Sequence, residues 1–232
     1  METSLHRQLK EFYRGPDARV EVKLGRYRID VVTPERLIEI QHGSLAAIRA
    51  KIAALVAEHD VLVVKPLIAA KRIVTLKRRG GRVARQRMSP KRATFADAFH
   101  DLIYFAKVFP HPRLTVELLL VEVEETRYPG HGRRRRWRRD DFEIEDQKLV
   151  SVLDLRTIRV AADLRTLLAG VPPGPFHTGN LAEAADIPRW VAQRVAYCLR
   201  ETGAARVAAR RRQGFVYEWN EPAKQRRPRR AA

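Results

Sequence analysis

The feature that most constrains the fold is a short unbroken aliphatic run, Val61-Leu62-Val63-Val64. This composition is typical of a strand that is buried on both faces, as in parallel sheets. Apolar residues recur at helical spacing in residues 45–56, and another short strand is predicted at residues 36–41. A strand, a helix and a strand of these lengths predict a right-handed crossover between parallel strands. The sequence therefore predicts an α/β fold.

Two predicted strands that lead into this crossover each carry one acidic residue. Residues 26–32 contain Asp30, and residues 36–41 contain Glu39 and Gln41. Because alternate side chains of a strand share a face, Glu39 and Gln41 point the same way. Carboxylates on neighbouring strands are hard oxygen ligands of the kind that Mg²⁺ binds. The alternative is an ordinary antiparallel sheet whose solvent face carries these polar residues by chance.

The order of the elements resembles the PD-(D/E)XK, or restriction-endonuclease-like, nuclease superfamily over about residues 4–68. A first helix with Glu11 precedes the strand with Asp30 and the strand with Glu39-x-Gln41, and the crossover helix and strand follow. The resemblance implies a mixed sheet flanked by helices. It also implies that Asp30 and Glu39 bind Mg²⁺ or Mn²⁺, which activates a water for attack on a phosphodiester. Glu11 would be the additional acid that some members carry on this helix.

Two positions depart from the pattern of the superfamily. Ile29 precedes Asp30 where proline is common, and Gln41 stands where lysine is usual. Glutamine can position a water by hydrogen bonds, but it supplies no positive charge. We expect a nearby cation to compensate, and the candidates are Arg49 and Lys51 on the following helix and Lys65 at the end of the next strand.

The charge balance favours a polyanionic partner. Lys and Arg total 46 against 27 Asp and Glu, which gives a net charge of +19. Basic side chains that neutralise phosphates release condensed counterions, and this drives association with nucleic acid. A solvated basic surface in an arginine-favouring genome is the other explanation. We expect a nucleic-acid partner, with DNA favoured over RNA.

Part of this charge is concentrated in an arginine-rich loop within residues 127–139. Six arginines surround Trp137 between residues 133 and 139, and like charges keep such a loop open until an anion binds. We predict that Arg134, Arg135 and Arg136 contact phosphates and that Trp137 stacks on a base or anchors the loop. A solvated loop and a nuclear localisation segment are the alternatives.

From residue 149 the pattern changes to short helices. We therefore predict a nuclease-like domain at residues 1–148, a smaller winged helix-turn-helix domain at 149–222 and a disordered basic tail at 223–232. The helix at 188–202 is the candidate recognition helix, because such helices enter the major groove. Its Arg189, Gln193 and Tyr197 form one i, i+4, i+8 row that could read base edges, with Arg194 beside it.

Two short predicted strands follow, and Arg211 and Arg212 lie between them. They would form a basic wing on the DNA backbone. A winged helix used for protein contacts or dimerisation is the alternative, so a homodimer stays open.

Several classes are excluded or disfavoured. The single cysteine, Cys198, cannot form a disulfide framework or a cysteine-based zinc site. Its place on the inner stripe of a predicted helix indicates a buried structural thiol. The longest aliphatic runs are far shorter than the ~20 residues of a membrane span, and no apolar leader opens the chain. We expect a cytoplasmic protein without a membrane partner, which would be nucleoid-associated if it binds DNA.

Three functions follow from these patterns. The first is a metal-dependent DNA endonuclease that is held on DNA by the winged helix and the basic loops. The second is a non-catalytic DNA-binding or regulatory protein on a degenerate nuclease scaffold. The third is a protein-interaction module with a basic surface. The whole chain is similar to an uncharacterised bacterial family that joins a nuclease-like domain to a winged helix, and that similarity brings no established activity.

Overall fold

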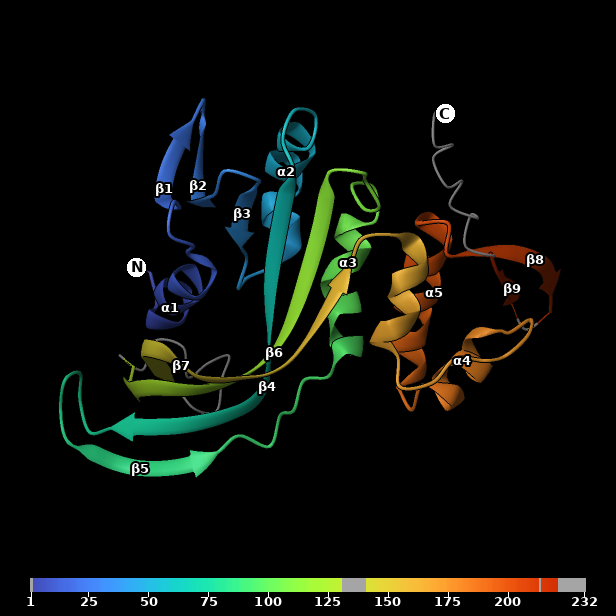
Figure 1. Cartoon of the computed structure of the whole chain (residues 1–232). Coiled ribbons are helices and arrows are strands. Elements are labelled where there is room, and N and C mark those ends of the chain that lie inside the picture. Colours follow the sequence, from blue (N-terminus) through green and yellow to red (C-terminus); the bar gives the residue numbers. More distant parts are fainter. Residues whose placement is uncertain (1, 131–140, 213, 221–232) are drawn as a thin grey trace.

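The computed structural model describes residues 2–130, 141–212 and 214–220. Its strands are β1 (Arg19–Leu24), β2 (Tyr27–Val32), β3 (Leu37–Ile40), β4 (Val61–Leu76), β5 (Val83–Met88), β6 (Leu114–Pro129), β7 (Phe142–Ile158), β8 (Ala205–Arg211) and β9 (Gly214–Trp219). Within the described residues, one mixed sheet has the order β1-β2-β3-β4-β6-β7, and β5 pairs with β4 (Figure 1). Strands β8 and β9 form a separate small sheet.

Helices flank this sheet, which confirms the predicted mixed α/β class. They are α1 (Ser4–Tyr13), α2 (Arg49–Leu55), α3 (Phe99–Phe105), α4 (Thr178–Ala184) and α5 (Arg189–Glu201). Short 3₁₀ helices η1 (Leu45–Ile48), η2 (Phe95–Ala98) and η3 (Ala161–Leu167) accompany them. In Figure 1, α1 lies toward the β1 edge of the sheet, and α5 lies beyond α3 from the sheet.

The aliphatic run at residues 61–64 opens β4 and is buried on both faces. Val61 and Val63 join the core that contains α2 and α3, whereas Leu62 and Val64 join the core under α1. The run needs no polar position because helices cover both sides of the strand. Strand β4 pairs in parallel with β3, as predicted from the crossover. Strand β4 continues well beyond this run and ends at Leu76.

The prediction of a short helix opening at Leu149 is wrong. Residues 142–158 form one long strand, β7, which pairs antiparallel with β6 along its whole length. The expected domain boundary after residue 148 therefore falls inside β7. Apolar residues of this strand such as Val150 and Leu153 stay exposed, and the apolar residues carry no clear period of two.

The C-terminal elements continue the main core. Leu181 of α4 and Val195 and Leu199 of α5 belong to the same buried cluster as Phe99 and Phe105 of α3. Helices α4 and α5 and the small β8–β9 sheet follow one another as a compact unit, and α5 packs on α3. Among the residues that the structure describes, no helix has the length and apolarity to cross a membrane.

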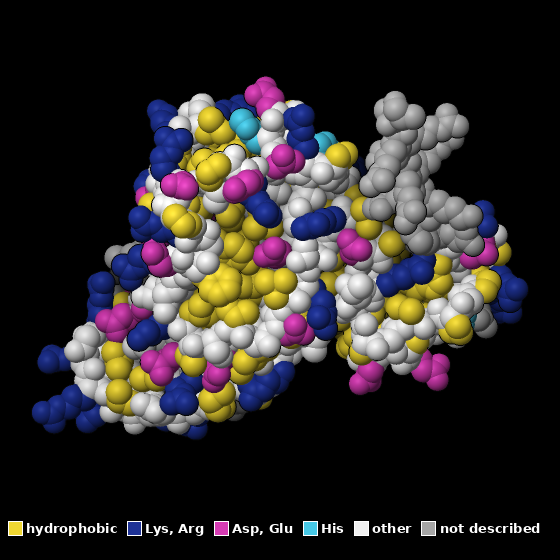
Figure 2. Space-filling model, in the orientation of Figure 1, with side chains coloured by type: hydrophobic (Ala, Val, Ile, Leu, Met, Phe, Trp, Pro, Cys, Tyr) yellow, Lys and Arg dark blue, Asp and Glu magenta, His cyan; other side chains and the backbone are white. Residues whose placement is uncertain are grey.

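The far halves of β4 and β6 curve away from α2 and α3 and, with β5, form an arm (Figure 1). Figure 2 shows Lys and Arg side chains gathered over the end of this arm. The exposed cations of the β4–β5 turn and of β5 are Lys77, Arg78, Arg79, Arg82, Arg85 and Arg87. The arm therefore adds a basic surface to the part of the chain that holds the large sheet.

Candidate active site

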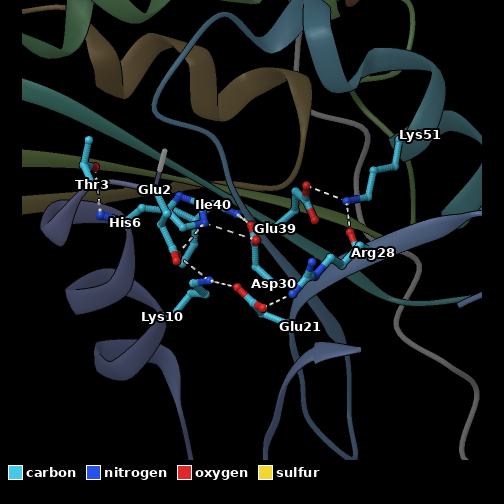
Figure 3. A network of polar contacts seen from close by, with 10 residues as sticks. All are labelled: Glu2, Thr3, His6, Lys10, Glu21, Arg28, Asp30, Glu39, Ile40 and Lys51. Carbon is cyan, nitrogen blue, oxygen red and sulfur yellow. Dashed lines mark hydrogen bonds and ion pairs between the residues drawn. The ribbon is translucent and has the colours of Figure 1, made fainter. Parts of the chain in front are cut away.

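Strands β2 and β3 separate at the two predicted metal ligands. The last pair of their antiparallel ladder is Val31 with Ile38, and the next residues that face each other are Asp30 and Glu39. In place of a ladder hydrogen bond, Asp30 Oδ2 accepts one from the Ile40 backbone N–H at 2.8 Å. Figure 3 shows both side chains with the charged groups that surround them. Asp30 is therefore bonded from α1 and Glu39 from α2, and the two carboxylates are close enough for the charge of Asp30 to raise the pKa of Glu39.

Asp30 is held in its ionised form. The Nε2 atom of His6, on α1, lies 3.1 Å from Asp30 Oδ1. Burial alone would raise the pKa of Asp30, but hydrogen bonds from His6 and from the Ile40 backbone hold it below its usual value. Both oxygens of this carboxylate are thus engaged by groups of the protein.

The pKa of Glu39 is shifted in the opposite direction to that of Asp30. Its side chain is buried, and burial followed by the charge of Asp30 raises its pKa. The Nζ atom of Lys51 opposes this rise by donating a hydrogen bond to Glu39 Oε1 at 2.6 Å. Glu39 Oε2 is buried and has no hydrogen-bond partner among the described residues. One carboxylate oxygen is therefore available at the centre of the site.

Of the three candidate cations, the structure brings Lys51 to the acids. Lys51 also donates to the backbone carbonyl of Arg28, which anchors its ammonium group beside Glu39. Lys65 instead pairs with Asp101 at 2.9 Å and is one of the few buried charged residues. Arg49 is exposed and lies in a groove beside α5.

Gln41 does not face the two carboxylates. Its Nε2 atom donates to the backbone carbonyl of Ser44 at 2.9 Å, and its backbone N–H pairs with Val64. Its side chain therefore braces the turn that leads from β3 into η1. The side chain that we expected to position a water is therefore engaged in a structural contact.

Glu11 also lies away from this site. Its side chain is 70% exposed and pairs with Arg14 at 3.4 Å. The N-terminal acid near Asp30 is Glu2, which contacts His6 and Lys10. Glu2, His6 and Lys10 are spaced four apart, so a search for i, i+4 rows facing the strands could have found them.

A second set of contacts extends this network. Lys10 is buried and bridges Glu2 to Glu21, whose other oxygen pairs with Arg28 (Figure 3). Burial lowers the pKa of Lys10, but its hydrogen bonds to Glu2 and Glu21 more than offset this and raise it overall. Glu21 has a backbone φ of +55°, which is unusual for a residue with a side chain. The strand distortion at Glu21 lies opposite Asp30 across the β1–β2 ladder.

Asp30 and Glu39 supply two carboxylates, of which Glu39 Oε2 is the oxygen without a hydrogen-bond partner among the described residues. Within the described ranges, no group of three or more His, Cys, Asp or Glu side chains is arranged to hold a metal. Mg²⁺ often uses one or two carboxylates and keeps several waters. An unpaired buried oxygen such as Glu39 Oε2 costs about 1–3 kcal/mol or more when it is charged, and a cation would remove that cost.

The predicted nucleic-acid contacts fall in three places. Gln193, Arg194 and Tyr197 line the groove between α5 and α3, and Arg189 is exposed at the start of α5. Arg211 and Arg212 are exposed at the end of β8 and in the turn that follows. Arg134, Arg135, Arg136 and Trp137 lie outside the described residues, as does the tail predicted at 223–232.

Comparison with known proteins identifies the family of this chain. Residues 3–159 match the family described as a domain of unknown function, DUF8091. The chain belongs to the DUF8091 family. An uncharacterized protein of Treponema pallidum (strain Nichols) is 27% identical over 183 residues, which are 78% of this chain and 72% of that protein. No solved structure matches the chain.

The DUF8091 segment coincides with the large sheet. It ends beside Ile158, the last residue of β7, and contains Asp30, Glu39, Lys51 and His6. Helices α4 and α5 and the β8–β9 sheet lie beyond it. These four residues of the candidate site therefore lie within the family domain.

Proposed function

We propose that this DUF8091 protein is a metal-dependent DNA endonuclease of the PD-(D/E)XK type. The observation that carries the proposal is that Asp30 and Glu39, on adjacent strands, are close enough for Asp30 to raise the pKa of Glu39, with the Lys51 ammonium 2.6 Å from Glu39 Oε1. Two acids and a lysine are the charged groups that the superfamily pattern requires. Here the lysine comes from helix α2 instead of from β3.

Asp30 and Glu39 would hold Mg²⁺ or Mn²⁺. When bound, such an ion activates a water and offsets the charge that develops on a phosphodiester. His6 keeps Asp30 ionised, and a bound cation would replace the His6 contact with Asp30 Oδ1. Lys51 supplies the positive charge that Gln41 cannot, and its contact with the Arg28 carbonyl fixes its position.

The C-terminal unit supports DNA binding as a winged helix. Helices α4 and α5 are followed by the β8–β9 hairpin, whose tip carries exposed Arg211 and Arg212. Arginines on such a tip contact backbone phosphates. The basic arm at β4–β5 offers a second phosphate surface, and the net charge of +19 favours association.

The decisive experiment is nicking of supercoiled plasmid in Mg²⁺ or Mn²⁺. We expect the wild-type protein to nick the plasmid and to stop when EDTA is added. Glu39→Ala should be inactive, whereas Glu58→Ala, a substitution of an exposed glutamate just after α2, should retain activity. If the wild type and Glu39→Ala leave the same background, the nuclease proposal fails.

A second candidate function is DNA binding without cleavage on the same scaffold. The observation that favours it is that both oxygens of Asp30 are engaged by His6 and Ile40, which leaves a cation only Glu39 Oε2 without rearrangement. This alternative predicts strong, salt-dependent DNA affinity that is unchanged by EDTA. A thermal shift assay with Mg²⁺ separates the two functions, because a ligand that binds only the folded state raises the melting temperature. Mg²⁺ should raise the melting temperature of a nuclease that binds it and leave that of a metal-independent DNA-binding protein unchanged.

A further inference from the structure

A groove lies along the packed helices α3 and α5 and reaches the start of α2. Its volume is about 640 Å³, within the range of small-molecule binding sites. Its lining residues come from the start of α2, from α3 and the short segment that follows α3, and from α5. They are Arg49, Ile103, Tyr104, Lys107, Trp190, Gln193, Arg194 and Tyr197. The groove therefore joins the DUF8091 domain to the C-terminal unit.

Aromatic side chains are unusually accessible in this groove. Trp190 is 53% exposed, Tyr104 is 47% exposed and Tyr197 is 37% exposed. Large aromatic rings normally bury most of their surface, since their burial is a major source of stability. Trp190 is held in place by stacking on His100, with ring centroids 5.0 Å apart and planes at 20°. The remaining ring surface is preorganised to accept another flat group.

The charges of the groove have one sign. Arg49, Lys107 and Arg194 contribute cations, and none of its lining residues is acidic. Arg194 also lies over the Trp190 ring at 5.1 Å and hydrogen-bonds His100. Exposed rings interleaved with cations are the pattern of single-strand binding surfaces, where bases stack on rings and phosphates meet Lys and Arg.

The packing of α5 disfavours insertion of this face into a duplex. The B-DNA major groove is about 12 Å wide, which admits one helix of about 10–12 Å diameter. Helix α3 packs directly on α5, and the His100 contacts tie the two helices together at Trp190 and Arg194. Two helices side by side are too wide for that groove, so this face suits bases that are already unpaired.

We propose that the groove between α3 and α5 binds unpaired nucleotides of a nucleic-acid strand. Bases stack on Trp190 and Tyr104, and phosphates contact Arg49, Lys107 and Arg194. The proposal deepens the proposed function, on which it rests for the identity of the ligand as nucleic acid. Arg49 and Lys51 point to nearly opposite sides of α2, because successive helical positions differ by about 100°.

The test is binding of a short fluorescein-labelled single strand, measured by anisotropy in EDTA so that no cleavage occurs. Trp190→Ala and Tyr104→Ala should each weaken binding roughly 5- to 150-fold, the range for loss of one stacked base. Trp190→Phe should restore part of the affinity. The matched control is Phe12→Ala, which removes a 58% exposed ring on α1 outside the groove and should bind like the wild type.

Competition distinguishes the sources of the ligand. Unlabelled single strand should compete far better than a duplex of the same sequence and better than a mononucleotide. Equal affinity of the Trp190→Ala and Phe12→Ala variants for the single strand would overturn the proposal, as would equal competition by duplex or by mononucleotide. Loss of binding in Trp190→Ala with no plasmid nicking by the wild type would sink the nuclease proposal and leave the groove standing.

Discussion

The ammonium of Lys51 lies 2.6 Å from Glu39 Oε1, although the lysine is on helix α2 and the glutamate is on strand β3. The crossover between β3 and β4 brings the helix back over the strand and places the cation against the acid. Both side chains are largely buried, at 16% and 9% exposure. Removing one member of such a pair leaves a buried charge without a partner.

Lys51→Met should therefore reduce both activity and stability. We expect loss of plasmid nicking and a decrease of about 3 kcal/mol in the free energy of unfolding, because Glu39 keeps its burial and loses its hydrogen bond. Urea denaturation and the nicking assay measure the two effects. Lys51→Arg should retain most of the stability. The matched substitution of an exposed lysine, Lys23→Met on β1, should change neither quantity, and activity in Lys51→Met equal to that in Lys23→Met would contradict the assigned role.

The two carboxylates of the site should affect stability with opposite signs. The pKa of Glu39 is raised by burial and by Asp30, so its ionisation destabilises the folded state. Glu39→Gln should therefore increase the free energy of unfolding at neutral pH by about 0.5–2 kcal/mol, because the amide oxygen can still accept the hydrogen bond from Lys51 while the cost of burying a carboxylate is removed. Asp30→Asn should decrease it by about 1–3 kcal/mol, because the lowered pKa of Asp30 marks a carboxylate that the fold stabilises.

The effects of Glu39 and Asp30 on stability also depend on pH in opposite directions. The stabilisation that Glu39 gives through its raised pKa is fully present below the pKa of this glutamate in the unfolded chain, near 4.5. It is lost as the pH rises through the higher pKa of Glu39 in the folded protein. The advantage of Glu39→Gln should thus disappear in acid. The contribution of Asp30 is present above about 3.8 and is lost as the pH falls through its lowered folded pKa. Changes of the same sign for both variants at neutral pH would contradict this account.

His6 sets the ionisation of Asp30. His6→Ala removes the 3.1 Å contact with Asp30 Oδ1, so the pKa of Asp30 should rise toward the value that burial favours. On acidification, the variant should begin to unfold at a higher pH than the wild type. An NMR titration of the Asp30 carboxyl measures the pKa shift directly. His59→Ala, at a position away from both carboxylates and after α2, is the control. An unchanged Asp30 titration in His6→Ala would exclude this role.

The tip of the β8–β9 hairpin should contribute phosphate contacts to duplex DNA binding. Arg211→Gln and Arg212→Gln should each lower the slope of log affinity against log salt by about 0.9, the value for one phosphate contact on B-DNA. Anisotropy titrations at several salt concentrations give this slope. Arg26→Gln, in the exposed β1–β2 turn, is the matched control. A slope identical to that of Arg26→Gln would remove the hairpin tip from the interface.

Cys198 should be unreactive in the folded protein. Burial, followed by the charge of Glu201, raises the pKa of its thiol to about 12, and the thiolate is the nucleophilic form. We expect reaction with Ellman's reagent only at the rate of unfolding, with full reaction in urea. Rapid labelling in native buffer would show that α5 opens readily from the core.

Much of the sheet follows from local patterns. The unbroken apolar run at 61–64 predicts a buried strand, and the helical spacing of apolar residues before it predicts the helix. Alternation of side chains predicts the acid-bearing strands. Strand β7 was missed because apolar residues fall on both of its faces beyond Leu149. What stabilises it there is pairing with β6, for example between Val121 and Val152, and such non-local pairing leaves no periodic trace in the sequence.

By itself the sequence determined the crossover and the spacing that places Asp30 and Glu39 on adjacent strands, since both depend on the alternation of side chains along a strand. Only the tertiary structure decided which cation reaches them. The crossover after Glu39 carries three candidate cations, Arg49, Lys51 and Lys65. The packing of α2 on the sheet turns Lys51 toward Glu39 and Arg49 toward the groove. The contact of His6 with Asp30 was decided in the same way, because α1 docks on the opposite face.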